Sequence, residues 1–122
     1  MEYDAGWLER EAIDSRQLEA LLEARERGEV RFFLVDVREP WEYEEAHIPG
    51  VDLLRPASSF RLWAGELAER TRDLPLILTC RTANRTGRLQ PLLRRLGHPR
   101  VINHLGGIVQ WQGPLEKGAY SE

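Results

Sequence analysis

The chain has 122 residues, 42% of them hydrophobic and 30% charged, which suits one folded core. Its net charge of −3 and pI near 5.7 argue against a general nucleic-acid binder. No apolar run approaches the roughly 20 residues that cross a bilayer. We therefore expect one domain over residues 1–122 that binds neither nucleic acid nor a membrane.

The first residues lack a basic segment followed by an apolar core, so we expect no signal peptide and a cytoplasmic protein. The single cysteine cannot form an internal disulfide. The three histidines have no neighbouring cysteines, so no zinc signature is present. We expect neither a metal nor an organic cofactor.

The first half of the chain is predicted to form a helix, a buried strand and a loop. Asp14 or Ser15 can cap a helix over residues 16–28, which Gly28 closes. Residues 30–37 are apolar on both faces, as in a central parallel strand. A polar loop is expected over residues 38–50, with prolines as turn markers, and a short strand over residues 51–54.

The second half continues the alternation. A helix is predicted over residues 58–70, with Ser58 or Ser59 as its cap and with Phe60, Leu62, Trp63 and Leu67 as its apolar residues. Strands over residues 74–79 and 100–103 flank a helix over residues 84–96, and a short helix begins in residues 106–113. Alternating strands and helices predict an α/β domain with a mainly parallel central sheet and helices on both faces.

Pro91 conflicts with the helix over residues 84–96, because an interior proline removes a hydrogen bond and costs about 3 kcal/mol. Either the helix begins late, near Arg88, or it is kinked. The sequence leaves both options open.

The only cysteine, Cys80, follows the strand at residues 74–79 and precedes a helix. Ligands of open α/β sheets bind outside the carboxyl ends of the strands. The short polar loop after Cys80 can turn its amides inward as an anion-binding nest. Amide dipoles, the helix terminus and Arg81, Arg85 and Arg88 would all favour the thiolate. The alternative is an inert buried cysteine, and from spacing alone both readings stay open.

Four segments together resemble the rhodanese-like sulfurtransferases. "CRTANRTGR" is similar to that family's active-site loop, Cys-Arg-Ser-Gly-Asn-Arg-Ser. "IDSRQLEALL", "FLVDVREPWEYEEAHIPGV" and "VINHLGGIVQW" are similar to its opening helix, its Asp-Val-Arg-Glu to His-Ile-Pro-Gly signature and its closing Leu-x-Gly-Gly-x-x-x-Trp. The resemblance covers about residues 12–113 and implies a single rhodanese-like domain.

The resemblance implies a sulfurtransferase of the thiosulfate type. Cys80 would be the catalytic nucleophile, would take the outer sulfur of a small anionic donor as a persulfide, and would pass it to cyanide or a thiol acceptor, which could belong to a protein. The substrate-binding loop would be Arg81, Thr82, Ala83, Asn84, Arg85 and Thr86. A non-catalytic carrier module that binds a partner protein is the alternative. Oligomeric state stays open.

The interval from Cys80 to Arg85 is Cys-x4-Arg. The related phosphatases and arsenate reductases carry Cys-x5-Arg, a loop wide enough for a tetrahedral oxyanion. The shorter loop favours sulfur transfer over phosphate or arsenate chemistry.

The chain departs from the family's pattern at several positions. Ala46 and Asp52 replace a glycine and a small apolar residue of the family, and Gln90-Pro91 replace alanines. Ala83 replaces the loop glycine. If that position needs a positive φ, alanine would be strained there.

Asp36, Arg38 and His47 are candidate supporting residues. We favour a structural role for the first two, with Asp36 capping a loop and Arg38 pairing with it. The imidazole of His47 is expected to bond backbone in a turn rather than to act as a base.

Other polar segments are expected on the surface. The charge run over residues 39–47 is interpreted as a solvated loop face. Arg94 and Arg95 are placed on the surface, although with Arg88 they could recruit an acidic acceptor protein. Trp111 is expected to pack into the core.

Overall fold

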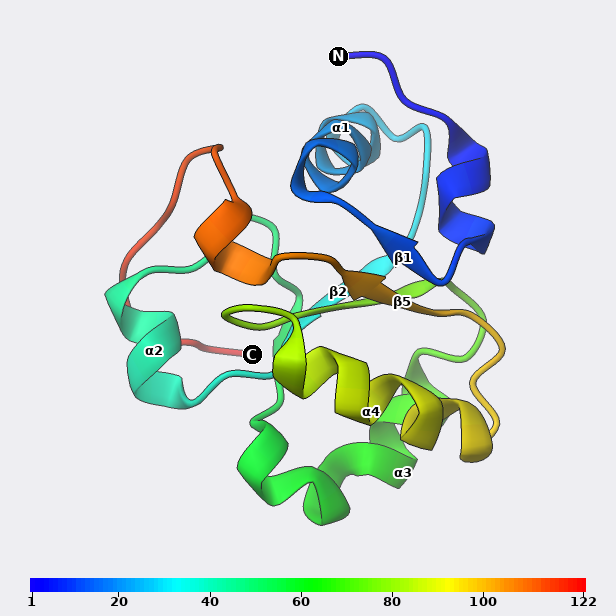
Figure 1. Cartoon of the computed structure of the whole chain (residues 1–122), viewed down its shortest axis with the longest axis vertical. Helices are drawn as coiled ribbons and strands as arrows, with labels where there is room; N and C mark the ends of the chain where they lie inside the picture. Colours follow the sequence, from blue (N-terminus) through cyan, green and yellow to red (C-terminus); the bar gives the residue numbers. More distant parts are fainter.

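The computed structural model describes residues 1–122 and contains a five-stranded sheet in the order β1-β5-β4-β2-β3, in which every strand pair is parallel (Figure 1). The strands are β1 (Ala12–Ile13), β2 (Phe33–Asp36), β3 (Leu53–Leu54), β4 (Leu76–Thr79) and β5 (Val101–His104). The α-helices are α1 (Ser15–Glu26), α2 (Pro40–Glu45), α3 (Phe60–Arg70) and α4 (Asn84–Arg95). Short 3-10 turns occupy η1 (Ala5–Glu9), η2 (Ala57–Ser59) and η3 (Gly107–Gln110).

The helices cover both faces of the sheet, as predicted (Figure 1). One hydrophobic cluster joins the sheet to α1 through Leu18 and Leu21. The other joins it to α3 and α4 through Trp63, Leu67 and Leu93. Central strand β4 is buried along its whole length, as its uninterrupted apolar sequence predicts. No helix combines the length and the apolar character needed to cross a bilayer.

Helix α1 begins and ends where the sequence predicts. Asp14 is its N-cap and accepts a hydrogen bond from the Gln17 amide at 2.8 Å, and Gln17 returns one from its own side chain to the Asp14 amide at 2.9 Å. Gly28 follows the helix with φ +77°, a conformation that glycine adopts without strain.

The expectation of a loop over residues 38–50 was wrong in its first half, which forms α2. Pro40 is the first residue of that helix, where its fixed φ is suitable and its missing N–H is not needed. Glu39 and Glu42 form a reciprocal capping box around the start. The charge run is therefore a capped helix whose apolar Tyr43 is buried.

The predicted apolar face of α3 was wrong at Leu62, which is 87% exposed. The buried face is formed by Trp63, Ala64, Leu67 and Ala68, which follow the helical spacing of three and four residues. Ser59 occupies the N-cap position, but its hydroxyl donates to the Pro56 carbonyl and does not cap the helix.

Of the two options left open for Pro91, the structure excludes the late start of the helix. Helix α4 begins at Asn84 and continues through Pro91 to Arg95, with Gly97 following at φ +103°. The short C-terminal helix predicted after Gly106 is a 3-10 turn, η3.

A fully buried histidine joins three elements next to the carboxyl edge of the sheet. The imidazole of His104 contacts the Thr79 hydroxyl at 2.8 Å through Nδ1 and the Ser15 hydroxyl at 2.7 Å through Nε2. Burial lowers the pKa of His104 to about 4 from 6.5. The folded protein therefore holds this side chain neutral, whereas the unfolded chain accepts a proton below pH 6.5.

We predict that the free energy of unfolding falls as the pH drops from 6.5 to about 4, because the unfolded state takes up the proton that folded His104 excludes. The depressed pKa corresponds to a loss on the order of 3 kcal/mol over this window. Denaturant titrations at a series of pH values measure it. His104→Gln should flatten this part of the profile, and an identical pH slope in the variant would contradict the assignment to His104.

Candidate active site

Cys80 lies directly after β4, at the carboxyl edge of the sheet where the sequence predicts a ligand site. Its side chain is 1% exposed and belongs to the hydrophobic cluster under α3 and α4. The chain then makes a short loop and enters α4 at Asn84. The sulfur is thus held between a buried strand and the start of a helix.

Two residues of the loop face the sulfur. The Ala83 amide donates to Cys80 Sγ at 3.1 Å, and the Thr86 hydroxyl lies 3.7 Å from the same atom. That hydroxyl also donates to the Ala83 carbonyl at 3.1 Å and contacts the Asn103 side chain on β5. The Ala83 N–H directed at the sulfur stabilises negative charge on it, whereas the single proton of the Thr86 hydroxyl goes to an oxygen acceptor.

Ala83 is the only residue other than glycine with a positive φ, at 76°. This left-handed backbone turns its N–H toward Sγ and forms the N-cap position of α4. The condition raised by the sequence is therefore met: the loop needs the glycine conformation, and an alanine adopts it under strain.

A second loop packs backbone to backbone against the cysteine. Gly107 adopts φ +62°, and a methyl group there would lie 2.6 Å from the Cys80 carbonyl oxygen and still closer to that of Arg81. The amides of Ile108 and Val109 donate to these two carbonyls at 2.9 and 3.2 Å. The Gly-Gly turn thus fixes the backbone from which the sulfur projects.

The three arginines expected to favour the thiolate form no hydrogen bond to the sulfur. Arg85 forms a bidentate pair with Glu42 of α2, with N–O distances of 2.7 and 3.0 Å, and Arg81 and Arg88 are exposed. The Arg85 hydrogen bonds lower the pKa of Glu42, and the Glu42 carboxylate raises the pKa of Arg85. Arg85 therefore ties the cysteine loop to α2, and negative charge on Cys80 also contributes to raising the Arg85 pKa.

Asp36 and Arg38 form a buried pair, as the structural reading predicts. Asp36 ends β2 beside Thr79 of β4, and its carboxylate accepts from the Arg38 guanidinium at 2.8 to 3.1 Å. Arg38 also donates to the Ala46 carbonyl at 2.8 Å. Through these contacts the pair fastens α2 to the sheet edge.

His47 likewise has structural contacts. Its Nδ1 lies 2.8 Å from the Tyr43 carbonyl, and its ring stacks on Tyr43 with centroids 3.7 Å apart. Its backbone forms an antiparallel bridge with Glu116. The imidazole is buried in this contact.

Within the predicted loop, the structure brings together Cys80, Ala83 and Thr86, while Thr82 and Asn84 are exposed. The sequence analysis missed Glu42, Asn103 and Gly107 as parts of the site. Glu42 lies in the charge run and Gly107 in the closing Gly-Gly motif. Both segments were noticed, but only the fold shows that they meet the cysteine loop.

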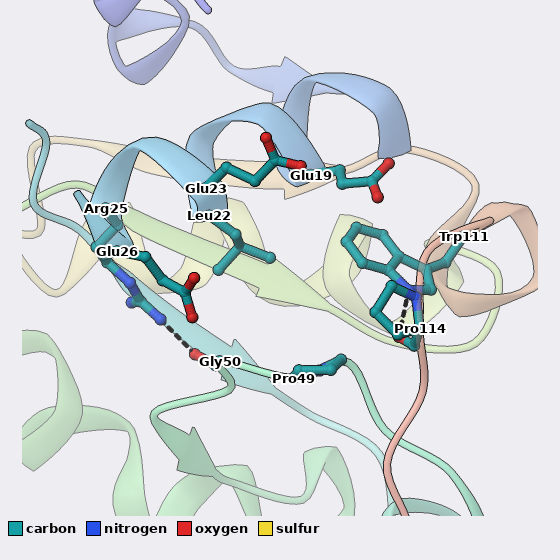
Figure 2. A pocket seen from close by; sticks show the side chains of 9 residues that line it. All are labelled: Glu19, Leu22, Glu23, Arg25, Glu26, Pro49, Gly50, Trp111 and Pro114. Carbon is teal, nitrogen blue, oxygen red and sulfur yellow. Dashed lines mark hydrogen bonds between the residues drawn. The ribbon is translucent and has the colours of Figure 1, made fainter. Parts of the chain in front are cut away.

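A separate cavity of about 190 Å³ lies along α1, away from the cysteine loop (Figure 2). Its walls include the Trp111 ring, Pro49, Pro114 and three glutamates of α1. Arg25 at its edge donates to the Gly50 carbonyl at 2.6 Å. None of its lining residues comes from residues 80–86.

The family model for the rhodanese-like domain matches residues 17–114, which confirms the resemblance. A rhodanese-related protein from Thermoplasma volcanium shares the fold, with a TM-score of 0.71 and 24% identity, over 88% of this chain and 98% of that one.

Curated relatives are similar over 83 residues, or 68% of this chain. The uncharacterized protein YqhL and the putative sulfur carrier protein YrkF, both of Bacillus subtilis, are 37% and 34% identical over 63% and 43% of their lengths. The probable adenylyltransferase/sulfurtransferase MoeZ of Mycobacterium tuberculosis is 33% identical over 21% of its length. The chain therefore spans less than two thirds of each relative.

We predict that Ala83→Gly stabilises the protein by about 1 kcal/mol, because glycine adopts the observed φ without a Cβ penalty. Ala68→Gly, within α3, is the control and should destabilise by at least roughly 1 kcal/mol. Equilibrium denaturation measures both. A loss of stability in Ala83→Gly would show that the positive φ is not strained.

Gly107→Ala should destabilise the protein by more than about 2 kcal/mol and slow every reaction of Cys80, since the added methyl collides with the Cys80 and Arg81 carbonyls. Gly65→Ala, a helical position with open space around the new methyl, should stabilise by about 1 kcal/mol. Thermal unfolding and thiol alkylation rates compare the two. Equal changes in stability and in alkylation rate for the two variants would mean that the contact between Gly107 and the two carbonyls does not constrain the cysteine loop.

Proposed function

This chain belongs to the rhodanese-like domain family, and from that premise we propose that it is a sulfurtransferase that carries sulfane sulfur as a persulfide on Cys80. The observation that carries the proposal is the Ala83 amide directed at Sγ, 3.1 Å away, from a strained loop conformation. A strained alanine persists only where the surrounding structure enforces it, and such strain is typical of functional loops.

In the first half-reaction, the Cys80 thiolate attacks the outer sulfur of an anionic donor such as thiosulfate. A bond forms between Sγ and that sulfur, the donor's sulfur–sulfur bond breaks, and sulfite leaves with the electron pair. The Ala83 amide, which donates to Sγ, stabilises negative charge there. No base is required once the thiol is ionised.

In the second half-reaction, cyanide or an acceptor thiolate attacks the outer sulfur of the persulfide. The bond between that sulfur and Sγ breaks, and the Cys80 thiolate leaves with the electron pair, which restores the starting enzyme. Because the chain has one cysteine, the persulfide cannot be lost as an internal disulfide. The loaded form must therefore await an external acceptor.

A carrier without turnover is the second candidate, and the name of one relative, a putative sulfur carrier protein, favours it. In that role Cys80 would still hold the persulfide. The difference is that a partner protein would load and unload it, and small donors would not.

We predict that incubation with thiosulfate increases the intact mass by one sulfur atom, and that cyanide removes the increment with formation of thiocyanate. Cys80→Ser should keep the fold and gain no sulfur, because the alcohol forms no persulfide. Intact-protein mass spectrometry and a thiocyanate assay measure the two steps.

No adduct from thiosulfate or from a glutathione persulfide would refute a sulfurtransferase that is loaded by small donors. If Cys80 is loaded only by the persulfide of a partner protein, the result supports the carrier role. Hydrolysis of an aryl phosphate dependent on Cys80 would indicate phosphatase chemistry.

A further inference from the structure

Helix α4 presents a solvent-exposed stripe that begins next to the cysteine loop. Arg88, Pro91, Leu92 and Arg95 are all exposed and follow the helical spacing of three and four residues. At 1.5 Å per residue, the stripe extends roughly 10 Å along the helix. Arg81, exposed in the loop itself, adds a third cation at its near end.

The arginines of this stripe differ from the other arginines nearby. Arg85 is paired with Glu42 at 2.7 Å, and Arg94 with Glu11 at 2.7 Å. Arg81, Arg88 and Arg95 form no ion pair. The stripe is therefore an uncompensated positive surface on a protein whose net charge is −3.

We propose that this stripe is the docking surface for an acidic acceptor protein that takes sulfur from Cys80. The inference rests on the proposed function, because it assigns the partner of the second half-reaction. Charge complementarity supplies the argument: free guanidinium groups beside the persulfide loop orient a carboxylate-rich surface and raise its rate of encounter.

The apolar residues of the stripe favour a protein partner over a nucleic acid. Pro91 and Leu92 separate Arg88 from Arg95, and Leu92 is 36% exposed. Phosphodiester backbones are held by clustered cations with little apolar contact. A protein surface offers apolar side chains between its carboxylates and matches the alternation on α4.

The test uses the full chain, loaded with sulfur from thiosulfate, and two synthetic peptides that each carry one cysteine. Glutamates flank the cysteine in one peptide and glutamines flank it in the other. Intact mass follows the loss of sulfur from the protein. At low ionic strength the ratio of the two rates, glutamate over glutamine, should be about tenfold higher for the wild type than for the double variant Arg88→Glu/Arg95→Glu.

The matched control is Arg16→Glu/Arg31→Glu, which makes the same change in net charge at exposed positions of α1 and just before β2. This control variant should keep the wild-type ratio of the two rates at low ionic strength. High salt should lower the ratio in the wild type and in the control variant, because salt screens the charges. An equal fall of the ratio in both double variants would overturn the proposal, since net charge alone would then explain it. An unchanged ratio in Arg88→Glu/Arg95→Glu would also overturn it.

Two further measurements distinguish a failure of the docking proposal from a failure of the proposed function. Thiosulfate loading of the Arg88→Glu/Arg95→Glu variant should match the wild type, and wild-type protein that does not load would refute the proposed function instead. Binding of a labelled single-stranded oligonucleotide that is lost in this variant, without a change in the peptide ratio, would assign the stripe to nucleic acid and overturn the proposal.

Discussion

The close approach of Gly107 to the carbonyls of Cys80 and Arg81 is the constraint on which the site depends. These two carbonyls accept hydrogen bonds from η3, so the cysteine loop is fastened at its outer side. The chain must then turn sharply to enter α4, and Ala83 makes that turn with a positive φ. The same turn directs the Ala83 amide to Sγ, so one backbone contact accounts for both the strain and the sulfur's environment.

The charges near the sulfur are organised to hold the backbone. Arg38 is neutralised by Asp36 and Arg85 by Glu42, and both pairs attach α2 to the elements that carry the cysteine. Buried or half-buried charges need such partners, because burial without them is costly. The groups that contact the sulfur are the Ala83 amide, which donates to it, and the Thr86 hydroxyl. The amide dipole favours negative charge on the sulfur without adding a net charge to the pocket.

The sequence was sufficient where the signal is local or periodic. Asp14 and Gly28 predict the limits of α1, and the apolar run before Cys80 predicts a central strand. It was insufficient where a residue's role depends on distant neighbours. Pro40 is equally suited to a turn and to the first position of a helix. The partner of Arg85 is 43 residues away in α2, so only the folded chain shows that Glu42 pairs with that guanidinium.

Under the proposed function, the two sides of α4 would separate the holding of sulfur from its delivery. Thr86, on the inner side of the helix, contacts Sγ and the Asn103 side chain. Arg88, on the outer side, is the first residue of the exposed stripe. Cys80 is 1% exposed, so a persulfide formed there would be shielded from chance thiols. An acceptor of that proposed persulfide would have to be brought to the loop in a suitable orientation. Unpaired arginines on the same helix can supply that orientation through long-range attraction, without adding charge to the pocket that holds the sulfur.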